Sequence, residues 1–439
     1  MCFESVRKDP MKKVLKKVLN TIDVPSDLDS VISIDHKQEV APESVGMTEK
    51  GADEIWQSVL NLYKTGTQPA IELCLRRKGE IVFNRSVGHV RGNGPLDTAY
   101  TPKTVATPDT PVCLFSASKA VTALLIHILA EDGSISLLDP VSYYCPEFAQ
   151  NGKKNITIHQ ILAHRGGIPG IPPNTPIEVL WDSDEIWRLL CEAKPISADG
   201  DHLAYHAITG GYVLERVIKT VTGKNIQEYL DEKIRKPMGM KYFTYGVEEK
   251  NLSILAENYM TGPKLGFPIS WVIKRALGGD VETIGQVVND PRFQEAVIPA
   301  GNLAATAEEI SRFFQMMKNG GVWNGKKICD PLTIKRSVQE YGSLQIDRTM
   351  MVPMRYSAGM MLGGNPVGIW GPMSGSAYGH IGLINKMCWV DEARDISCSL
   401  LTTGISFVGH HIPSLVMFVN AVAKNCPRVT EEQKTGAFA

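Results

Sequence analysis

Ser116 and Lys119 stand three residues apart in the segment FSASKAVTALL, residues 115–125. Residues with this spacing share one face of a helix, so the lysine amine can reach the serine hydroxyl. A neutral amine can accept the hydroxyl proton, and burial or the positive end of the helix dipole lowers the lysine pKa toward that neutral state. The pair therefore predicts a serine nucleophile that attacks a carbonyl carbon and forms an acyl-enzyme.

Spacing alone does not establish this chemistry, because serine is also a common helix N-cap. Ser5 and Lys8 show the same spacing near the start of the chain. The setting of Ser116 is different, since apolar VCLF precedes it and apolar AVTALLIHILA follows Lys119. A polar pair at the start of a buried helix is not ordinary solvated surface, so we take Ser116 and Lys119 as candidate catalytic residues.

The elements that would position this pair form a simple order along the chain. A helix capped by Thr48 is predicted over 48–63, followed by a β-hairpin that turns at Lys78–Gly79. Residues 116–300 are mainly helices and loops, and a capping box of Thr306 and Glu309 begins a later helix. Two strands, 382–390 and 395–403, and a closing helix over 412–423 complete the chain.

Strands near both ends with helices between them predict an α+β fold, in which both ends of the chain build one antiparallel sheet. Flanking helices cover the sheet, and a mainly helical domain is inserted. The predicted divisions are a basic N-terminal helix and linker, an α/β sheet domain in two parts, an inserted helical domain and a polar tail: 1–47, 48–110 with 301–425, 111–300, and 426–439.

Composition excludes several classes of function. The formal net charge of the 439 residues is −1, which gives no electrostatic basis for binding nucleic acid. Nine scattered cysteines without a CxxC pair indicate reduced thiols in the protein core. No apolar stretch is long enough to span a membrane, and lysines interrupt the apolar residues near the N-terminus, so we expect a cytoplasmic protein.

The N-terminal residues 11–22 predict an amphipathic helix. Apolar residues recur at helical spacing, and lysines 12, 13, 16 and 17 occupy the other face. Such a helix either docks on the body of the protein or lies on an anionic membrane surface, and the sequence leaves both alternatives open.

Longer segments around the Ser–Lys pair resemble a known superfamily. The segment FSASKAVTALLIHILAEDGSISLLDPVSYYCPEF resembles the active-site segment of the serine β-lactamases and penicillin-binding proteins. ITIHQILAHRGGIPG is similar to the loop after that helix, and PAGNLAATAEEISRFFQMM to the later "PAGG" helix. The likeness is greatest to class C β-lactamases and family VIII carboxylesterases and extends over residues 48–425. It implies a β-lactamase-like fold.

The resemblance extends to a tyrosine motif at LAYHAITGGYVLERV, where it implies that Tyr205 shares proton transfer with Lys119. The superfamily rationale is a tyrosinate held between cationic or donor groups. The third position of the motif is Ala207 instead of asparagine. That asparagine helps to hold the amide of a lactam or peptide, so its absence disfavours lactams and leaves ester chemistry intact. The alternative to this catalytic role is that Tyr205 is an aromatic residue of the hydrophobic core.

The third superfamily element is Lys-Thr-Gly on a strand beside the nucleophile. The literal match at Lys434–Gly436 lies in the polar tail, with no strand to follow it. We instead take His380-Ile381-Gly382, which is predicted to open the first C-terminal strand, because family VIII esterases often carry His-x-Gly here. By this resemblance His380 lines the substrate site, Gly382 allows close approach of substrate, and the Leu383 N–H with the Ser116 N–H forms the oxyanion hole.

These observations predict a serine hydrolase that cleaves small carboxylic esters through an acyl-enzyme. No cofactor or metal is expected, because His202 and His206, four residues apart, lack a third ligand in the sequence. Acyl transfer uses the same acyl-enzyme and is the nearest alternative. A β-lactamase or D,D-peptidase and a non-catalytic binding protein are the others. Residues 243–298 are the least family-like part and are expected to form a lid or acyl pocket, or to pack against the helical domain.

Overall fold

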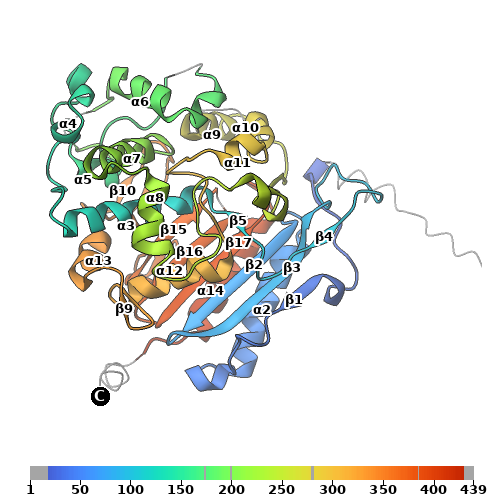
Figure 1. The fold of residues 1–439 in the computed structure, drawn as a ribbon. Coiled ribbons are helices and arrows are strands. Elements are labelled where there is room, and N and C mark those ends of the chain that lie inside the picture. Colours follow the sequence, from blue (N-terminus) through green and yellow to red (C-terminus); the bar gives the residue numbers. More distant parts are fainter. Residues whose placement is uncertain (1–17, 173–174, 198–199, 278–280, 384, 430–439) are drawn as a thin grey trace, which may run out of the picture.

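The computed structural model describes residues 18–172, 175–197, 200–277, 281–383 and 385–429 (Figure 1). Ser5 and Lys8, most of the predicted helix 11–22 and the segment Lys434–Gly436 lie outside these residues. Within the described part of the chain, no helix is both long and apolar enough to cross a bilayer.

Both ends of the chain contribute to one antiparallel sheet. The strand order is β1-β3-β2-β17-β16-β15-β12, with β4 paired to β3. The N-terminal hairpin joins the C-terminal strands along β2 and β17, where Ile71 pairs with Thr402 and Arg77 with Ile396. The strands of this sheet are β1 (Ile32–Ile34), β2 (Ala70–Arg77), β3 (Glu80–Arg91), β4 (Thr104–Val105), β12 (Met361–Leu362), β15 (Ala377–Gly382), β16 (Lys386–Asp391) and β17 (Ile396–Thr402).

The sheet confirms the predicted α+β fold and adds a strand. The hairpin turns at Lys78–Gly79 as predicted. Residues 20–47 were predicted to be a linker, but they contain β1, which pairs with the outer edge of β3. A strand of three residues, Ile-Ser-Ile, is too short to give a clear signal in the sequence, and its pairing partner lies more than 50 residues away, at Val87 for Ile32.

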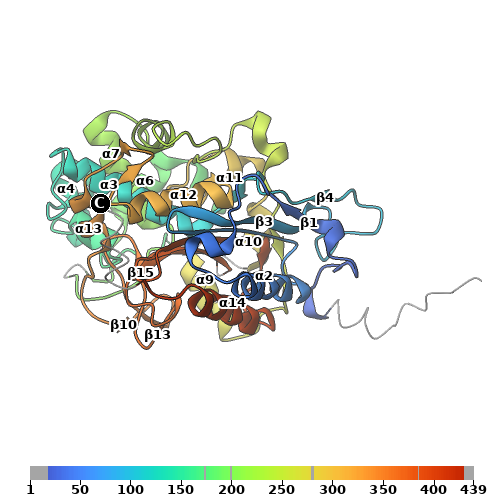
Figure 2. The same ribbon diagram turned by 90° about the horizontal axis from the view of Figure 1, so that it is seen from below.

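Helices cover both faces of the sheet. On one face, α2 (Glu49–Lys64) lies beside α14 (His411–Asn425), and α12 (Ala307–Lys318) crosses the other face (Figure 2). Every residue of β2 is buried, and the alternation of side chains along a strand divides them between the two faces. Leu73 belongs to the cluster that contains residues of α2 and α14, and Cys74 to the cluster on the opposite face.

Most of the remaining helices gather beside the sheet as a helical layer, in the upper part of Figure 1, whereas α9 lies toward the side of α2 and α14 in Figure 2. The remaining helices are α3 (Ser118–Glu131), α4 (Val141–Tyr144), α5 (Ile158–Leu162), α6 (Ser183–Glu192), α7 (Thr209–Thr222), α8 (Ile226–Leu230), α9 (Ile269–Leu277), α10 (Val281–Val287), α11 (Pro291–Glu295) and α13 (Pro331–Val338). Short two-stranded ladders join β5 (Val112–Cys113) to β7 (Ala304–Ala305), β6 (Tyr259–Met260) to β18 (Gly404–Ile405), β8 (Val322–Trp323) to β9 (Lys326–Lys327), β10 (Gln345–Ile346) to β11 (Pro353–Met354) and β13 (Val367–Gly368) to β14 (Gly371–Pro372).

One large hydrophobic cluster connects the sheet with the helical layer. It contains Cys74 and Cys388 from the sheet together with residues of α3 and α7, such as Leu124 and Val213. This cluster is continuous across residues 110 and 300, where the sequence predicts boundaries between the sheet domain and the helical domain. The division into these domains stays a prediction.

The predicted N-cap of α2 gives a test of the local analysis. The Thr48 side chain accepts a hydrogen bond from the Gly51 N–H at 3.0 Å. Replacing an N-cap threonine by alanine leaves that N–H without its partner, so Thr48→Ala should lower the free energy of unfolding by about 1 kcal/mol. Thr48→Ser keeps the hydroxyl and should unfold like the wild type in urea. Equal stability of the alanine and serine variants would show that this cap contributes nothing.

Candidate active site

The nucleophile candidate lies on a tight turn that leads into α3. Ser116 is the middle residue of a 3-10 turn, Phe115–Ala117, and α3 begins only at Ser118. The helix predicted from Ser116 therefore starts two residues later. Phe115 has a φ of +48°, in the left-handed region that a bulky residue rarely adopts. This turn holds Ser116 half-buried while the side chains on either side of it are buried.

Hydrogen bonds of Ser118 hold this turn in place. The Ser118 hydroxyl donates to the Phe115 carbonyl at 2.5 Å and accepts from the Leu303 N–H at 3.1 Å. The same serine that begins α3 therefore closes the turn before it and links that turn to the strand β7 region.

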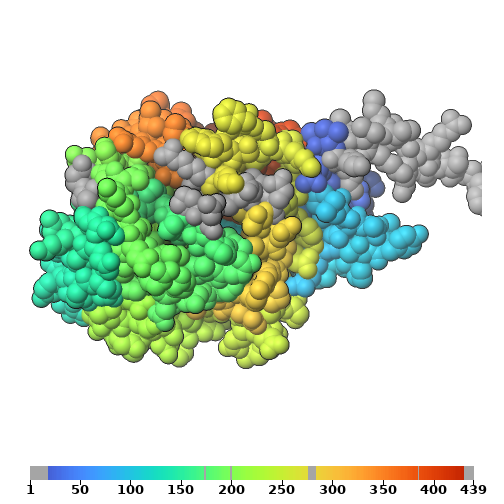
Figure 3. Space-filling model, turned by 90° about the horizontal axis from the view of Figure 1, so that it is seen from above, coloured from blue at the N-terminus to red at the C-terminus, as the bar shows by residue number. Residues whose placement is uncertain are grey.

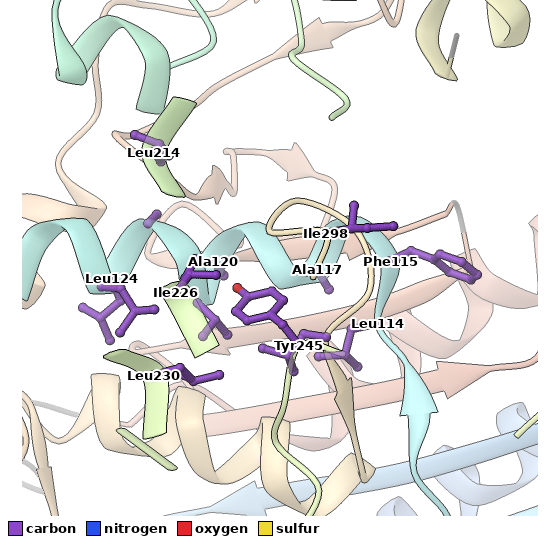
Figure 4. Close-up of a cluster of buried hydrophobic side chains, with 14 of the residues drawn as sticks. Leu114, Phe115, Ala117, Ala120, Leu124, Leu214, Ile226, Leu230, Tyr245 and Ile298 are labelled. Atoms are coloured by element: carbon purple, nitrogen blue, oxygen red, sulfur yellow. The ribbon is translucent and has the colours of Figure 1, made fainter. Parts of the chain in front are cut away.

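Lys119 is buried because α3 is surrounded on all sides. Residues 118–129 of this helix are all buried, between the sheet and the helical layer (Figure 4). A helix that is apolar around its whole circumference is typical of a protein core. Burial lowers the pKa of Lys119 from 10.5 to about 7. Near neutral pH, Lys119 is therefore an uncharged amine in about half of the protein molecules.

The partners of the Lys119 amine suit its uncharged form. Its Nζ lies 2.6 Å from the Ala207 carbonyl oxygen, 2.9 Å from the Ala300 carbonyl oxygen and 3.1 Å from the Ser116 Oγ. A neutral amine has two N–H groups and one lone pair. The two carbonyls can accept both N–H groups, which leaves the lone pair facing the serine hydroxyl. The geometry is therefore that of a base and its proton donor.

Tyr205 lies on the other side of the serine. Its hydroxyl is hydrogen-bonded to Ser116, and the Lys119 Nζ is 5.0 Å from the centre of its ring. Burial and the nearby Asp347 carboxylate raise the pKa of Tyr205 well above 10, although the hydrogen bond to Ser116 opposes this shift. The tyrosinate suggested by the superfamily resemblance is thus disfavoured here. Tyr205 is a neutral phenol that can donate and accept a proton in a relay.

Three buried histidines surround the Ser–Lys–Tyr group, and all are neutral. Burial is the main cause, and the Lys119 amine adds to it; together they lower the pKa of His206 and His380 to about 3 and that of His164 well below 6.5. The ring of His164 lies 4.6 Å from that of Tyr205. Neutral histidines add no positive charge beside Lys119, so the cluster around it is polar without being ionic.

His380 and Gly382 close a strand instead of opening one. They are residues of β15, which ends at Gly382, and a turn then leads to β16. The sequence prediction was wrong on this point because a turn separates Gly382 from Lys386, within the segment 382–390 that was predicted to be one strand. The His380 Nδ1 lies 2.8 Å from the Ile381 carbonyl, so Nδ1 carries the proton and Nε2 is an acceptor. Within the described residues that Nε2 has no partner.

Gly382 lets the end of β15 touch the nucleophile turn. A Cβ at this position would lie 2.0 Å from the Leu114 carbonyl oxygen and 3.4 Å from the Ala117 nitrogen. The next residue, Leu383, has a φ of +32°. Only a residue without a side chain permits this contact, which brings the Leu383 backbone to the turn that carries Ser116.

Four residues have roles at the site that the sequence analysis missed. Two are Ala207 and Ala300, which act through carbonyl oxygens, and alanine gives no sequence signal for such a role. The third is Asp347, whose Oδ1 accepts hydrogen bonds from the N–H groups of Tyr205, Thr349 and Met350 at 3.1, 2.8 and 2.9 Å. This carboxylate fixes the backbone of Tyr205, and its distance of 142 residues along the chain conceals it.

The fourth is Lys386, a second buried lysine, which lies beneath the nucleophile turn. Its Nζ is 4.6 Å from the centre of the Phe115 ring and 3.1 Å from the Asn258 Oδ1. Burial lowers the pKa of Lys386 to about 8. A cation over an aromatic face is attracted to it, so the lysine supports Phe115 in its left-handed conformation.

Cysteines do not compete with Ser116 as the nucleophile. The eight cysteines among the described residues are buried and free, as the sequence predicted for core thiols. Burial raises the pKa of Cys113 to about 11 and those of Cys74 and Cys388 to about 12, so these thiols remain protonated and unreactive.

The contact at Gly382 predicts the effect of adding a methyl group there. Gly382→Ala must push the Leu383 backbone away from the turn, so the rate at which a fluorophosphonate labels Ser116 should fall about a hundredfold. Gly170→Ala is the matched control, because a Cβ at Gly170 meets no atom within 4 Å. Labelling of the Gly382→Ala variant at the wild-type rate would mean that this contact does not set the geometry around Ser116.

Comparison with known proteins finds relatives that share sequence or fold with this chain. A curated relative, the esterase/beta-lactamase LipL of Mycobacterium tuberculosis, is 27% identical over 304 residues, which are 67% of this chain and 69% of LipL. A penicillin-binding-protein homologue from Caulobacter crescentus has a TM-score of 0.72 at 23% identity, covering 86% of this chain and 98% of the homologue. A family VIII carboxylesterase also has a TM-score of 0.72, at 24% identity, covering 87% of this chain and 99% of the esterase. The two structures share its fold.

The family model described as Beta-lactamase matches residues 59–408. This range contains the Ser116 turn, the Tyr205 segment and the end of β15. With most of the chain and every element of the site inside one match, the protein belongs to the Beta-lactamase family.

Proposed function

We propose that this protein is a serine hydrolase that cleaves carboxylic esters through a covalent acyl-enzyme. The observation that carries the proposal is the environment of Lys119. Its amine is buried, its pKa is about 7, and two backbone carbonyls accept its N–H groups while the serine oxygen lies 3.1 Å away. This is an arrangement in which a lysine serves as a general base at neutral pH.

In the proposed acylation step, the Ser116 oxygen attacks the ester carbonyl carbon and its proton passes to the Lys119 amine. The N–H groups of Ser116 and Leu383 hold the negative charge that develops on the carbonyl oxygen. When the tetrahedral intermediate collapses, the bond to the alcohol breaks, and the proton moves from Lys119 through the Tyr205 hydroxyl to the departing oxygen. Lys119 is then neutral again.

In the deacylation step, water takes the place of the alcohol. Its oxygen attacks the acyl carbon, and its proton passes through Tyr205 to Lys119. The acid departs when the bond to Ser116 breaks, and Lys119 returns the proton to the serine oxygen. The enzyme is thereby restored, and the sum of the two steps is one ester and one water converted into an alcohol and an acid.

Two residues favour esters over lactams or peptides. Ala207 stands where class C enzymes have the asparagine that helps to hold an amide. His380 stands where they have a lysine, and its pKa of about 3 keeps it neutral. A neutral imidazole offers no cation to the carboxylate of a penicillin or peptide. The family VIII carboxylesterase that is similar to this chain supports the same preference, whereas the name of LipL, an esterase/beta-lactamase, covers both activities.

The proposal predicts turnover of p-nitrophenyl acetate, butyrate or octanoate that depends on Ser116. Ser116→Ala removes the nucleophile and should lower kcat/KM by at least about a thousandfold. Ser134→Ala is the control, because Ser134 is an exposed serine just beyond the far end of α3. Nitrocefin should be hydrolysed far more slowly than the best ester.

Each other result contradicts part of the proposal. Ester turnover that survives in Ser116→Ala would identify a different nucleophile. Nitrocefin turnover exceeding that of the esters would make the protein a β-lactamase. Acyl product formed on added methanol in preference to free acid would make acyl transfer its reaction. A wild type that neither turns over these substrates nor reacts with a fluorophosphonate would be a binding protein.

A further inference from the structure

The two N–H groups proposed to hold the oxyanion lie on segments that are distant in sequence. Ser116 follows Phe115 in the nucleophile turn, and Leu383 begins the turn between β15 and β16. Two donors stabilise the charge on one oxygen only when both lie about 3 Å from it. The structure must therefore fix one of these turns relative to the other.

Gly382 permits the two turns to approach, but a missing side chain cannot attach them to one another. Each turn also contains a residue in an unfavourable conformation, with a φ of +48° at Phe115 and +32° at Leu383. Residues with side chains keep such a backbone only where the surrounding contacts enforce it. A side chain that contacts both turns would meet this need.

Lys386 is attached to both turns. Its backbone begins β16 and pairs with Gly382 across the β15–β16 ladder, so it closes the turn that starts at Leu383. Its side chain extends to the nucleophile turn, where the Nζ lies 4.6 Å from the centre of the Phe115 ring. One end of this lysine thus contacts the residue before Leu383, and the other end contacts the residue before Ser116.

A third contact fixes the position of the amine. The Lys386 Nζ donates to the Asn258 Oδ1 at 3.1 Å. The Asn258 N–H donates to the Asn289 Oδ1 at 2.9 Å, and the Asn289 amide donates to the Asn258 carbonyl at 2.7 Å. The chain that follows Asn258, in yellow, reaches the molecular surface in Figure 3, whereas Lys386 is only 2% exposed. A buried ammonium is attracted to an aromatic face more strongly than an exposed one.

Three titratable groups face the Lys386 amine: Glu72 on β2, Cys113 on β5 and Cys388 on β16. Burial raises the pKa of Cys113 to about 11 and that of Cys388 to about 12, so both thiols are uncharged at neutral pH. Burial also raises the pKa of Glu72 well above 4.5, which favours its neutral form. Burial lowers the pKa of Lys386 to about 8, so the amine is mostly charged at pH 7.

We propose that Lys386 is a positioning residue that holds the N–H groups of Ser116 and Leu383 in the geometry of one oxyanion hole. Its ammonium keeps the Phe115 ring, and with it the nucleophile turn, against the end of β15. Because the side chain is buried, it acts through Phe115 and does not touch the substrate. This inference rests on the proposed function, since it assigns a role in the same reaction.

The rate at which a fluorophosphonate labels Ser116 tests the proposal without knowledge of the natural ester. Lys386→Met removes the charge but keeps an unbranched side chain, and should lower this rate about tenfold. Phe115→Leu removes the ring and should lower the rate by a similar factor. The double variant Phe115→Leu/Lys386→Met should be no slower than either single variant, because both changes remove one contact.

The pH dependence of labelling separates positioning from packing. In the wild type, the rate should rise through about pH 7 as Lys119 loses its proton, and fall above about pH 8 as Lys386 loses its proton. Lys386→Met should keep the rise and lack the fall. A Lys386→Met profile that still falls above this pH would assign the fall to another group and overturn the role of the Lys386 charge.

Lys153→Met is the matched control. Lys153 is also buried, and its Nζ lies 5.5 Å from the centre of the Phe148 ring. Its amine, however, donates to the carbonyls of Gln150 and Cys191 in the helical layer, at 2.9 and 2.8 Å. Lys153→Met should unfold at a lower temperature and still be labelled at the wild-type rate. Lys386→Met should unfold no more easily than the wild type, because it removes a buried charge that has no counter-ion.

The outcomes distinguish this inference from the proposed function. A wild type that is not labelled would overturn the proposed function and this inference with it. A labelled wild type matched in rate by Lys386→Met would overturn this inference alone. So would a double variant whose loss is the product of the two single losses, or a Lys153→Met variant that is slowed as much as Lys386→Met.

Discussion

The structure depends on a lysine amine that is buried without a charged partner. Lys119 is buried on α3, and its three hydrogen-bond partners are two carbonyl oxygens and one hydroxyl. An ion in such a place would lose its hydration without gaining a counter-ion, so the neutral amine is favoured. The surrounding histidines are neutral for the same reason. The chemistry proposed for Ser116 follows from this one constraint.

The whole fold is needed to create that environment. The carbonyls that hold Lys119 are 88 and 181 residues away from it along the chain. Close approach of these segments requires residues without side chains. A Cβ at Gly211 would lie 2.7 Å from the backbone nitrogen of Ala300, and one at Gly382 would meet the Leu114 carbonyl. The sheet brings β15 to the nucleophile turn, and the helical layer brings Ala207, so neither half alone forms the site.

Features encoded within a few residues were predicted from the sequence. The turn at Lys78–Gly79, the Thr48 cap and the Thr306–Glu309 capping box depend on neighbouring residues, and the structure contains all three. The spacing of Ser116 and Lys119 is equally local. Motif order located Tyr205 and the His380–Gly382 segment, which the structure brings together around the serine, but not the position of that segment within its strand.

Features that depend on distant contacts were not predictable in this way. Asp347 fixes Tyr205 across 142 residues, and Lys386 bonds Asn258 across 128. The protonation state of Tyr205 depends on burial and on Asp347, neither of which is visible in its own motif. The exposure of Phe267, at 85%, is a further case, because an apolar segment fits a pocket and a surface equally well until its neighbours are known.

The pKa of Lys119 is the quantity that tests this account most directly. It can be measured by NMR titration of the protein carrying ¹³C at the lysine Cε, with the Lys119 signal assigned by its absence in Lys119→Arg. We predict a midpoint of about 7, so that below this pH the amine is protonated and cannot accept the Ser116 proton. A midpoint near 10.5, the ordinary value for lysine, would mean that the amine is charged at neutral pH and cannot be the base.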